Sequence, residues 1–175
     1  MTELLYLGDL SCRITSNHNT VLYVNPDKGK DYSRKADIIL QTTETNKSLV
    51  QLHITTDQTK IINQDLLVVG DKFNYQDIEI ERISDDAYRI FVDDKKILVC
   101  GKQDIIVDGN DDYALVPILH TQISEEKMTD LAKQIIPVNT SEVALFDYRV
   151  AIALQVKNKL IIEPAMVIDL QKENH

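Results

Sequence analysis

The chain has 175 residues and a formal net charge of −9, because 28 Asp and Glu outnumber 19 Lys and Arg. This length suits one domain with a sizeable core, and we expect a single domain over residues 1–175. An acidic surface repels nucleic-acid phosphates, so we expect no nucleic-acid partner. With four histidines and two cysteines, the chain has little material for metal or nucleophile chemistry.

The cysteines and the N-terminus bear on the cellular compartment. Cys12 and Cys100 lie in apolar, strand-like runs, where a free cysteine behaves as a small buried hydrophobe. The N-terminus does not resemble a secretory signal, and no apolar run approaches the ~20 residues that a membrane helix needs. We therefore expect reduced thiols, a cytoplasmic protein and no membrane partner.

Short β-branched and aromatic runs separated by polar turns dominate the sequence, which is typical of an all-β or α/β sandwich. The first quarter predicts an antiparallel meander, and the apolar run at 36–41 predicts a strand buried on both faces. Turns are predicted at 17–19, 70–72 and 93–95, and a short helical segment at 46–53. Up to Cys100, strands are predicted at 4–7, 11–15, 21–24, 36–41, 60–62, 66–69, 77–83, 88–92 and 96–100.

The rest of the chain predicts one clear helix among further strands. Ser124 is a suitable N-cap for this helix, and Pro137 ends it because proline cannot donate the next hydrogen bond. Its buried face consists of Met128, Leu131, Ala132 and Ile135 at helical spacing. The strands predicted in this part are 105–107, 113–118, 143–146, 150–156, 159–162 and 167–170.

A search for site motifs gives no catalytic or metal-binding pattern. The chain has no His-x-His, Cys-x-x-Cys, Gly-x-Ser-x-Gly or phosphate-binding glycine loop. His18 in a predicted turn and His175 at the terminus are expected to be exposed, whereas His120 follows a predicted strand where a functional loop could begin. The acidic pairs at 85–86, 93–94 and 111–112 are expected to be solvated turns.

A series of strand-and-turn pieces nevertheless follows the order of a known family. Residues 6–8 (Tyr-Leu-Gly) and 11–14 (Ser-Cys-Arg-Ile) resemble the opening strand pair of the metallo-β-lactamase-fold hydrolases, in particular the branch related to L-ascorbate-6-phosphate lactonase. The predicted helix matches that family in place, and residues 159–170 resemble its closing hairpin. Other similar pieces are 21–26, 36–42, 68–73, 78–80, 95–101, 112–118 and 136–138.

The resemblance implies an α/β (α+β) fold, a sandwich of two mixed β-sheets with reduced outer helices. It also shows what this chain lacks, because the family's His-x-His-x-Asp-His metal loop falls on residues 43–48, Thr-Glu-Thr-Asn-Lys-Ser. A binuclear zinc or manganese site therefore has no ligands, and we expect no metal and no cofactor. The other replaced family positions fall on Gly8-Asp9, Asn25, Lys102 and Asn139.

These replacements favour a catalytically inactive, metal-free domain that acts as a binding or assembly module. The partner is expected to be a second copy of the chain, since shortened helices leave apolar sheet faces for a subunit to cover, or another protein. An alternative is a hydrolase of the same superfamily with an atypical or metal-independent site, and another is a small-molecule or carbohydrate-binding sandwich unrelated to the family. Candidate side chains of the vestigial cleft are Glu44, Lys102, Asp104, His120 and Asn139.

Overall fold

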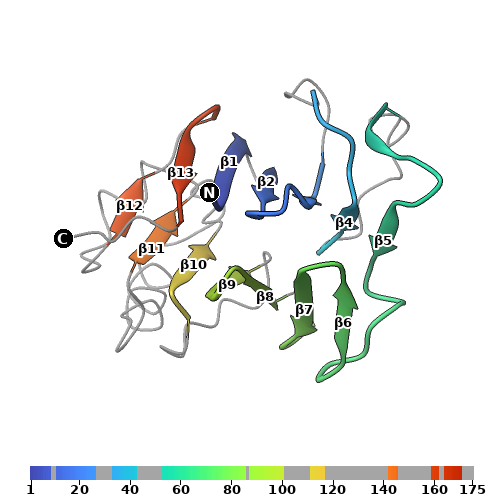
Figure 1. The fold of residues 1–175 in the computed structure, drawn as a ribbon. Helices are drawn as coiled ribbons and strands as arrows, with labels where there is room; N and C mark the ends of the chain where they lie inside the picture. The colour runs from blue at the N-terminus through green and yellow to red at the C-terminus, as the bar shows by residue number, and fades with distance from the viewer. Residues whose placement is uncertain are drawn as a thin grey trace.

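The strands of the protein form two mixed β-sheets packed face to face, sheet A above sheet B in Figure 1. The fold is thus the predicted sandwich. Among the described residues, no helix has the length and apolar character needed to cross a membrane. The computed structural model describes residues 1–8, 11–26, 33–42, 53–85, 87–100, 111–116, 142–145, 159–161 and 164–170.

Sheet A has six strands in the order β13-β1-β2-β3-β4-β5. The first three strands of the chain form the predicted antiparallel meander, and β3, β4 and β5 run parallel. All three residues of β4 are fully buried, which confirms the strand predicted to be buried on both faces. The bounds are β1 Glu3–Gly8, β2 Ser11–Thr15, β3 Val21–Val24, β4 Ile38–Leu40, β5 Lys60–Ile62 and β13 Val167–Asp169.

Sheet B has seven strands in the order β12-β11-β10-β9-β8-β7-β6, antiparallel from β6 to β9 and parallel from β9 to β12. The turn between β8 and β9 has two residues, Asp93 and Asp94, both with positive φ (46° and 65°), as a tight hairpin requires. The bounds are β6 Lys72–Tyr75, β7 Ile78–Arg82, β8 Ala87–Val92, β9 Lys95–Cys100, β10 Tyr113–Val116, β11 Glu142–Leu145 and β12 Lys159–Ile161.

The main core lies between the sheets and follows from the alternation of side chains along the strands. Leu4 and Ile14 of sheet A and Ile80 and Ile90 of sheet B are completely buried in it. A second apolar cluster lies on the opposite face of sheet A and includes Tyr23. Sheet A therefore buries apolar side chains on both of its faces.

Both cysteines are buried free thiols, as the sequence predicts. Burial raises the pKa of Cys12 to about 12, because the thiolate would lose its hydration inside the core. Cys12 lies on β2 among the side chains of the main core. It is thus a packing residue, not a nucleophile.

Two predictions about β-strands near residue 70 were wrong. Residues 66–69 do not form a strand but part of a loop between β5 and β6, in which only Leu67 is buried. Lys72 was assigned to a turn, whereas it begins strand β6. Strand β6 alternates polar residues with Phe73 and Tyr75, which pack against the main core, and it pairs with β7.

The predicted closing hairpin was also wrong, because β12 pairs with β11 in sheet B and β13 pairs with β1 in sheet A. Of the predicted solvated acidic turns, Asp111 is 3% exposed and pairs with Arg89, so its charge is buried and neutralised. Of the predicted helical segment, only His53 is described, and it is helical. The predictions at 105–107, 124–136 and 150–156 lie outside the described residues.

Candidate functional site

The five side chains predicted for a vestigial cleft all lie outside the described residues, so their convergence stays a prediction. Close to Glu44 in the sequence, the structure describes the ends of the parallel strands β3 and β4, which lie side by side. The predicted side chains are Glu44, Lys102, Asp104, His120 and Asn139.

A buried side-chain bridge joins the chain beyond β3 to the chain beyond β4. Asn25 is 6% exposed and follows β3 with a left-handed φ of 47°, which asparagine tolerates better than most residues. Its Oδ1 accepts a hydrogen bond from the Thr42 N–H at 2.9 Å, and its Nδ2 donates to Thr42 Oγ1 at 2.8 Å. Its own N–H donates to the Leu40 carbonyl at 2.8 Å. Both polar atoms of the Asn25 amide are therefore used to hold the segment that leads into residue 43.

Replacing Asn25 by alanine is expected to destabilise the protein by about 2 kcal/mol, since the buried Thr42 N–H loses its acceptor and the left-handed backbone loses a tolerant residue. Urea unfolding measures the change. Asn25→Gly is the matched control, because glycine keeps the backbone conformation and removes only the amide. Equal stability of Asn25→Ala and the unmodified protein would show that the bridge contributes nothing.

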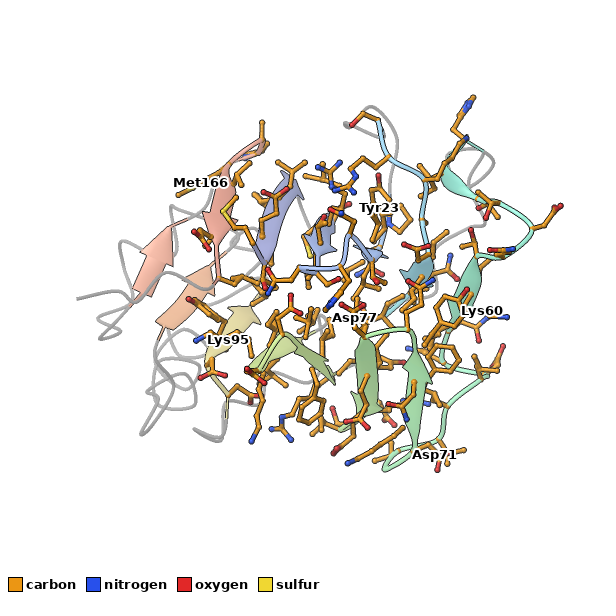
Figure 2. The ribbon with its side chains drawn as sticks, in the orientation of Figure 1. Tyr23, Lys60, Asp71, Asp77, Lys95 and Met166 are labelled. Atoms are coloured by element: carbon orange, nitrogen blue, oxygen red, sulfur yellow. The ribbon has the colours of Figure 1, made fainter. Side chains whose placement is uncertain are left out.

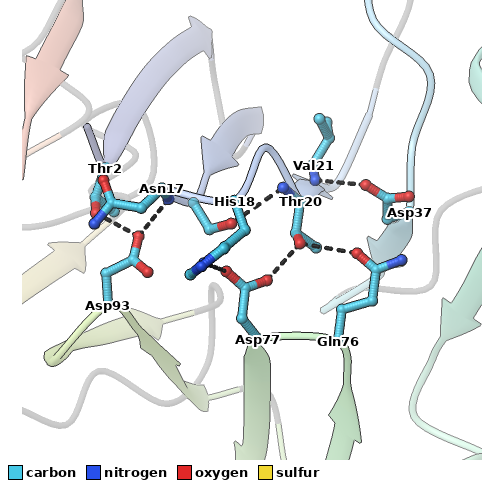
Figure 3. A network of polar contacts seen from close by, with 10 residues as sticks. Thr2, Asn17, His18, Thr20, Val21, Asp37, Gln76, Asp77 and Asp93 are labelled. Atoms are coloured by element: carbon cyan, nitrogen blue, oxygen red, sulfur yellow. Dashed lines mark hydrogen bonds and ion pairs between the residues drawn. The ribbon is translucent and has the colours of Figure 1, made fainter.

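A second polar cluster lies at the opposite end of the strands, which we call the hairpin end: the turns at 16–20, 76–77 and 93–94. Figure 3 shows that Asp77 and Asp93 reach from sheet B toward the β2–β3 turn of sheet A. Asp93 Oδ2 accepts hydrogen bonds from Thr2 Oγ1 and from the Asn17 N–H, both at 2.6 Å. One nitrogen of His18 and one oxygen each of Asp77 and Asp93 lie within 4.8 Å of one another. The hairpin end thus joins the two sheets through carboxylates.

Asp77 is held in its ionised form by the groups around it. His18 Nδ1 lies 3.3 Å from Asp77 Oδ2, and the Thr20 hydroxyl donates to Asp77 Oδ1. Partial burial opposes ionisation, but hydrogen bonds from Ser16, Thr20, the Asp77 backbone and His18 outweigh it and lower the pKa of Asp77 below its ordinary value. The carboxylate is therefore charged at neutral pH.

The hairpin end opens onto a groove of about 560 Å³, large enough for a small ligand. His18, Asp77 and Asp93 lie on its wall together with apolar Phe91. Carboxylates outnumber ammonium groups along it, so the groove favours cations. Its charged side chains, apart from His18, are Asp77, Glu79, Asp93, Asp94, Lys95 and Lys96.

A third feature is the 63–71 loop, which joins β5 to β6 along the right of Figure 1. Arg82 fixes this loop by donating hydrogen bonds from Nη1 to the carbonyls of Gln64 (3.0 Å) and Leu67 (2.6 Å). The same guanidinium also donates to the carbonyls of Ser84 and Asp85, and Leu67 anchors the loop in the core. The loop is therefore held in one conformation by side-chain contacts.

The 63–71 loop carries three of the exposed large apolar side chains of the described residues. Leu66 is 53% exposed, Val68 64% and Val69 53%. The loop lies between β5 and β6, which are the outermost strands on one side of the described sheets. Ile61 of β5 is also exposed, by 41%, so apolar surface continues along that edge.

The hairpin end and the 63–71 loop were not predicted from the sequence. It assigned His18 to an exposed turn, which is correct, since the side chain is 80% exposed, but it did not connect His18 with acidic turns far along the chain. It read 66–69 as a strand because apolar, β-branched runs usually are strands. The turn residues around Asp77 and Asp93 were the available signal for the hairpin end, and nothing local indicated Arg82.

Comparisons with known proteins agree on the fold. No family model matches the chain, and no curated protein matches it in sequence. A metallo hydrolase from the archaeon Ignicoccus hospitalis, Igni18, has a similar structure (TM-score 0.64, 13% identity), covering 95% of this chain and 97% of that protein. A putative zinc-dependent hydrolase of the metallo-β-lactamase superfamily from Thermotoga maritima is similar with a TM-score of 0.57 and 11% identity, covering 83% and 75%.

Zinc-bound PqqB from Methylobacterium extorquens is a further similar structure, with a TM-score of 0.54 and 9% identity over 91% of this chain and 85% of that one. At such identities the similarity shows the fold alone.

Proposed function

We propose that this chain, which has a metallo-β-lactamase-like fold, is a catalytically inactive relative of the ascorbate-phosphate lactonase branch, metal-free in the family's cleft, that acts as a self-assembly module. The observation that carries the assembly role is the 63–71 loop, where three apolar side chains are more than half exposed on a segment held by Arg82. A fixed apolar surface binds with little loss of conformational entropy.

The charges around the 63–71 loop favour a second copy of the chain as the partner. Exposed Asp65 and Asp71 belong to the loop, and exposed Lys60 and Lys72 belong to the flanking strands β5 and β6. Figure 2 shows Lys60 and Asp71 on the same side of the molecule. Under two-fold symmetry the same patch meets itself, so a patch with both signs can place each lysine against an aspartate. The outer strands β5 and β6 add backbone groups that a second copy can pair with.

The proposed loss of catalysis is supported by the residues that follow strands β3 and β4. Residues 43–48 carry none of the family's ligands, and the Asn25 amide is already bonded to Thr42. The alternative, a hydrolase with an atypical site, depends on Glu44, Lys102 and His120 meeting in one cleft. Two equivalents of zinc per chain in protein purified without chelators would contradict the metal-free proposal.

Replacing Val68 by aspartate is expected to weaken self-association about thirtyfold or more, because a charge would be buried in the interface. Sedimentation equilibrium over a range of concentrations measures the association constant. Val167→Asp is the matched control: Val167 is 55% exposed on β13, at the far side of sheet A, and its replacement should change nothing. An unmodified chain that stays monomeric at high concentration would overturn the assembly role.

A further inference from the structure

The carboxylate of Asp93 is half-buried at the hairpin end and accepts two hydrogen bonds. Its hydrogen bonds come from neutral groups, the Thr2 hydroxyl and the Asn17 N–H. Within the part of the chain that the structure describes, no lysine or arginine forms an ion pair with it. A carboxylate removed from water is normally paired with a cation or bound to a metal. Among the described residues, Asp93 therefore has no lysine or arginine partner.

The neighbours of Asp93 are metal-binding groups. A carboxylate oxygen of Asp77 and an imidazole nitrogen of His18 lie within 4.8 Å of an Asp93 oxygen and of one another. Ligands of one zinc ion lie about 3–3.5 Å apart, so small side-chain rotations close the difference. The His18 side chain is 80% exposed and can turn to make this adjustment.

The other hydrogen bonds of these carboxylates fit metal binding. Thr20 holds Asp77 through Oδ1, so that Oδ2 faces His18. The Thr2 hydroxyl and the Asn17 N–H both donate to Asp93 Oδ2, so that Asp93 Oδ1 can bind a metal ion. Metal-binding carboxylates are usually oriented by such outer partners. The adjoining groove gives an ion access to the cluster and leaves room for a water molecule as a further ligand.

We infer that His18, Asp77 and Asp93 bind one divalent transition-metal ion of the zinc class at the hairpin end. One nitrogen and two carboxylate oxygens with an open position suit zinc, whereas magnesium prefers six oxygens. The three ligands come from the β2–β3, β6–β7 and β8–β9 turns, so the ion links sheet A to sheet B. The site lies at the opposite end of the strands from Asn25 and does not depend on the proposed assembly role.

Isothermal titration of the full-length, chelator-treated protein with ZnCl₂ tests the inference. We expect one equivalent of zinc to bind, no comparable binding of MgCl₂, and a rise of about 5–10 °C in the thermal midpoint at a hundredfold excess over Kd. His18→Gln and Asp93→Asn should each weaken zinc binding about tenfold or more. His53→Gln, at another exposed histidine, should bind zinc like the unmodified protein.

The possible results separate this site from the proposed function. No zinc binding, equal binding of magnesium, or unchanged affinity in both His18→Gln and Asp93→Asn would overturn the site. One equivalent of zinc bound with unchanged affinity in both variants would place the metal outside the hairpin end. The Val68→Asp variant should bind zinc normally, so a failure of self-association leaves the metal site standing.

Discussion

Replacing Asp111 by asparagine is expected to lower the free energy of unfolding by about 3–5 kcal/mol. Asp111 is bound by Arg89 through two parallel hydrogen bonds, Nε to Oδ1 at 2.6 Å and Nη2 to Oδ2 at 3.1 Å. The side chain of Arg89 is 13% exposed and that of Asp111 is 1% exposed. Water therefore cannot solvate the Arg89 guanidinium once the carboxylate charge is removed. Asparagine keeps the shape of aspartate and removes the charge, and urea unfolding measures the loss.

Two controls identify the cause of this loss. The double variant Arg89→Met, Asp111→Leu should be more stable than Asp111→Asn, because no buried charge is left unpaired. Glu81→Gln removes an exposed pair, since Lys72 Nζ lies 3.9 Å from Glu81 and is 52% exposed, and should cost at most about 0.5 kcal/mol. A loss for Asp111→Asn as small as that for Glu81→Gln would contradict the role of the buried pair.

Replacing Arg82 by methionine is expected to cost about 2–4 kcal/mol and to weaken self-association. Four backbone carbonyls, those of Gln64, Leu67, Ser84 and Asp85, lose a charged donor, and each such hydrogen bond contributes about 1 kcal/mol or more. Methionine keeps most of the side-chain length, so packing changes little. Urea unfolding gives the stability, and amide hydrogen exchange over residues 63–71 reports the order of the loop.

The Arg82 variant also connects the loop with the proposed interface. Arg82→Lys keeps the charge but cannot reach four carbonyls with one ammonium group, so it should restore only part of the stability. Faster exchange in the 63–71 loop should accompany weaker self-association. Faster exchange with an unchanged association constant would mean that the loop is not the interface.

Many strands of this protein could be predicted because their pattern is local. Alternating apolar residues in β7 and β8 give each strand one buried face, and the polar pairs between strands form the turns. Residues 66–69 were wrongly predicted to be a strand because their conformation depends on Arg82, the last residue of β7 in sheet B. Burial of Asp111 likewise depends on Arg89, 22 positions earlier in the chain.

The hairpin end shows why a site of this kind is hidden in the sequence. His18 and Asp77 are 59 positions apart, and neither carries a motif that indicates the other. They meet because antiparallel pairing in both sheets brings several turns to the same end of the strands. Asn25 and Thr42 meet for a related reason, since the parallel strands β3 and β4 end together.

The sequence by itself determined the sandwich class and most strand positions. Those features depend on side-chain alternation, turn residues and residue identity, which are properties of neighbouring positions. The tertiary structure alone decided that β12 and β13 belong to different sheets, that the 63–71 loop is held with its valines exposed, and that His18 lies beside Asp77. Each of these depends on contacts between segments far apart in the sequence, so the pattern of neighbouring residues does not indicate it.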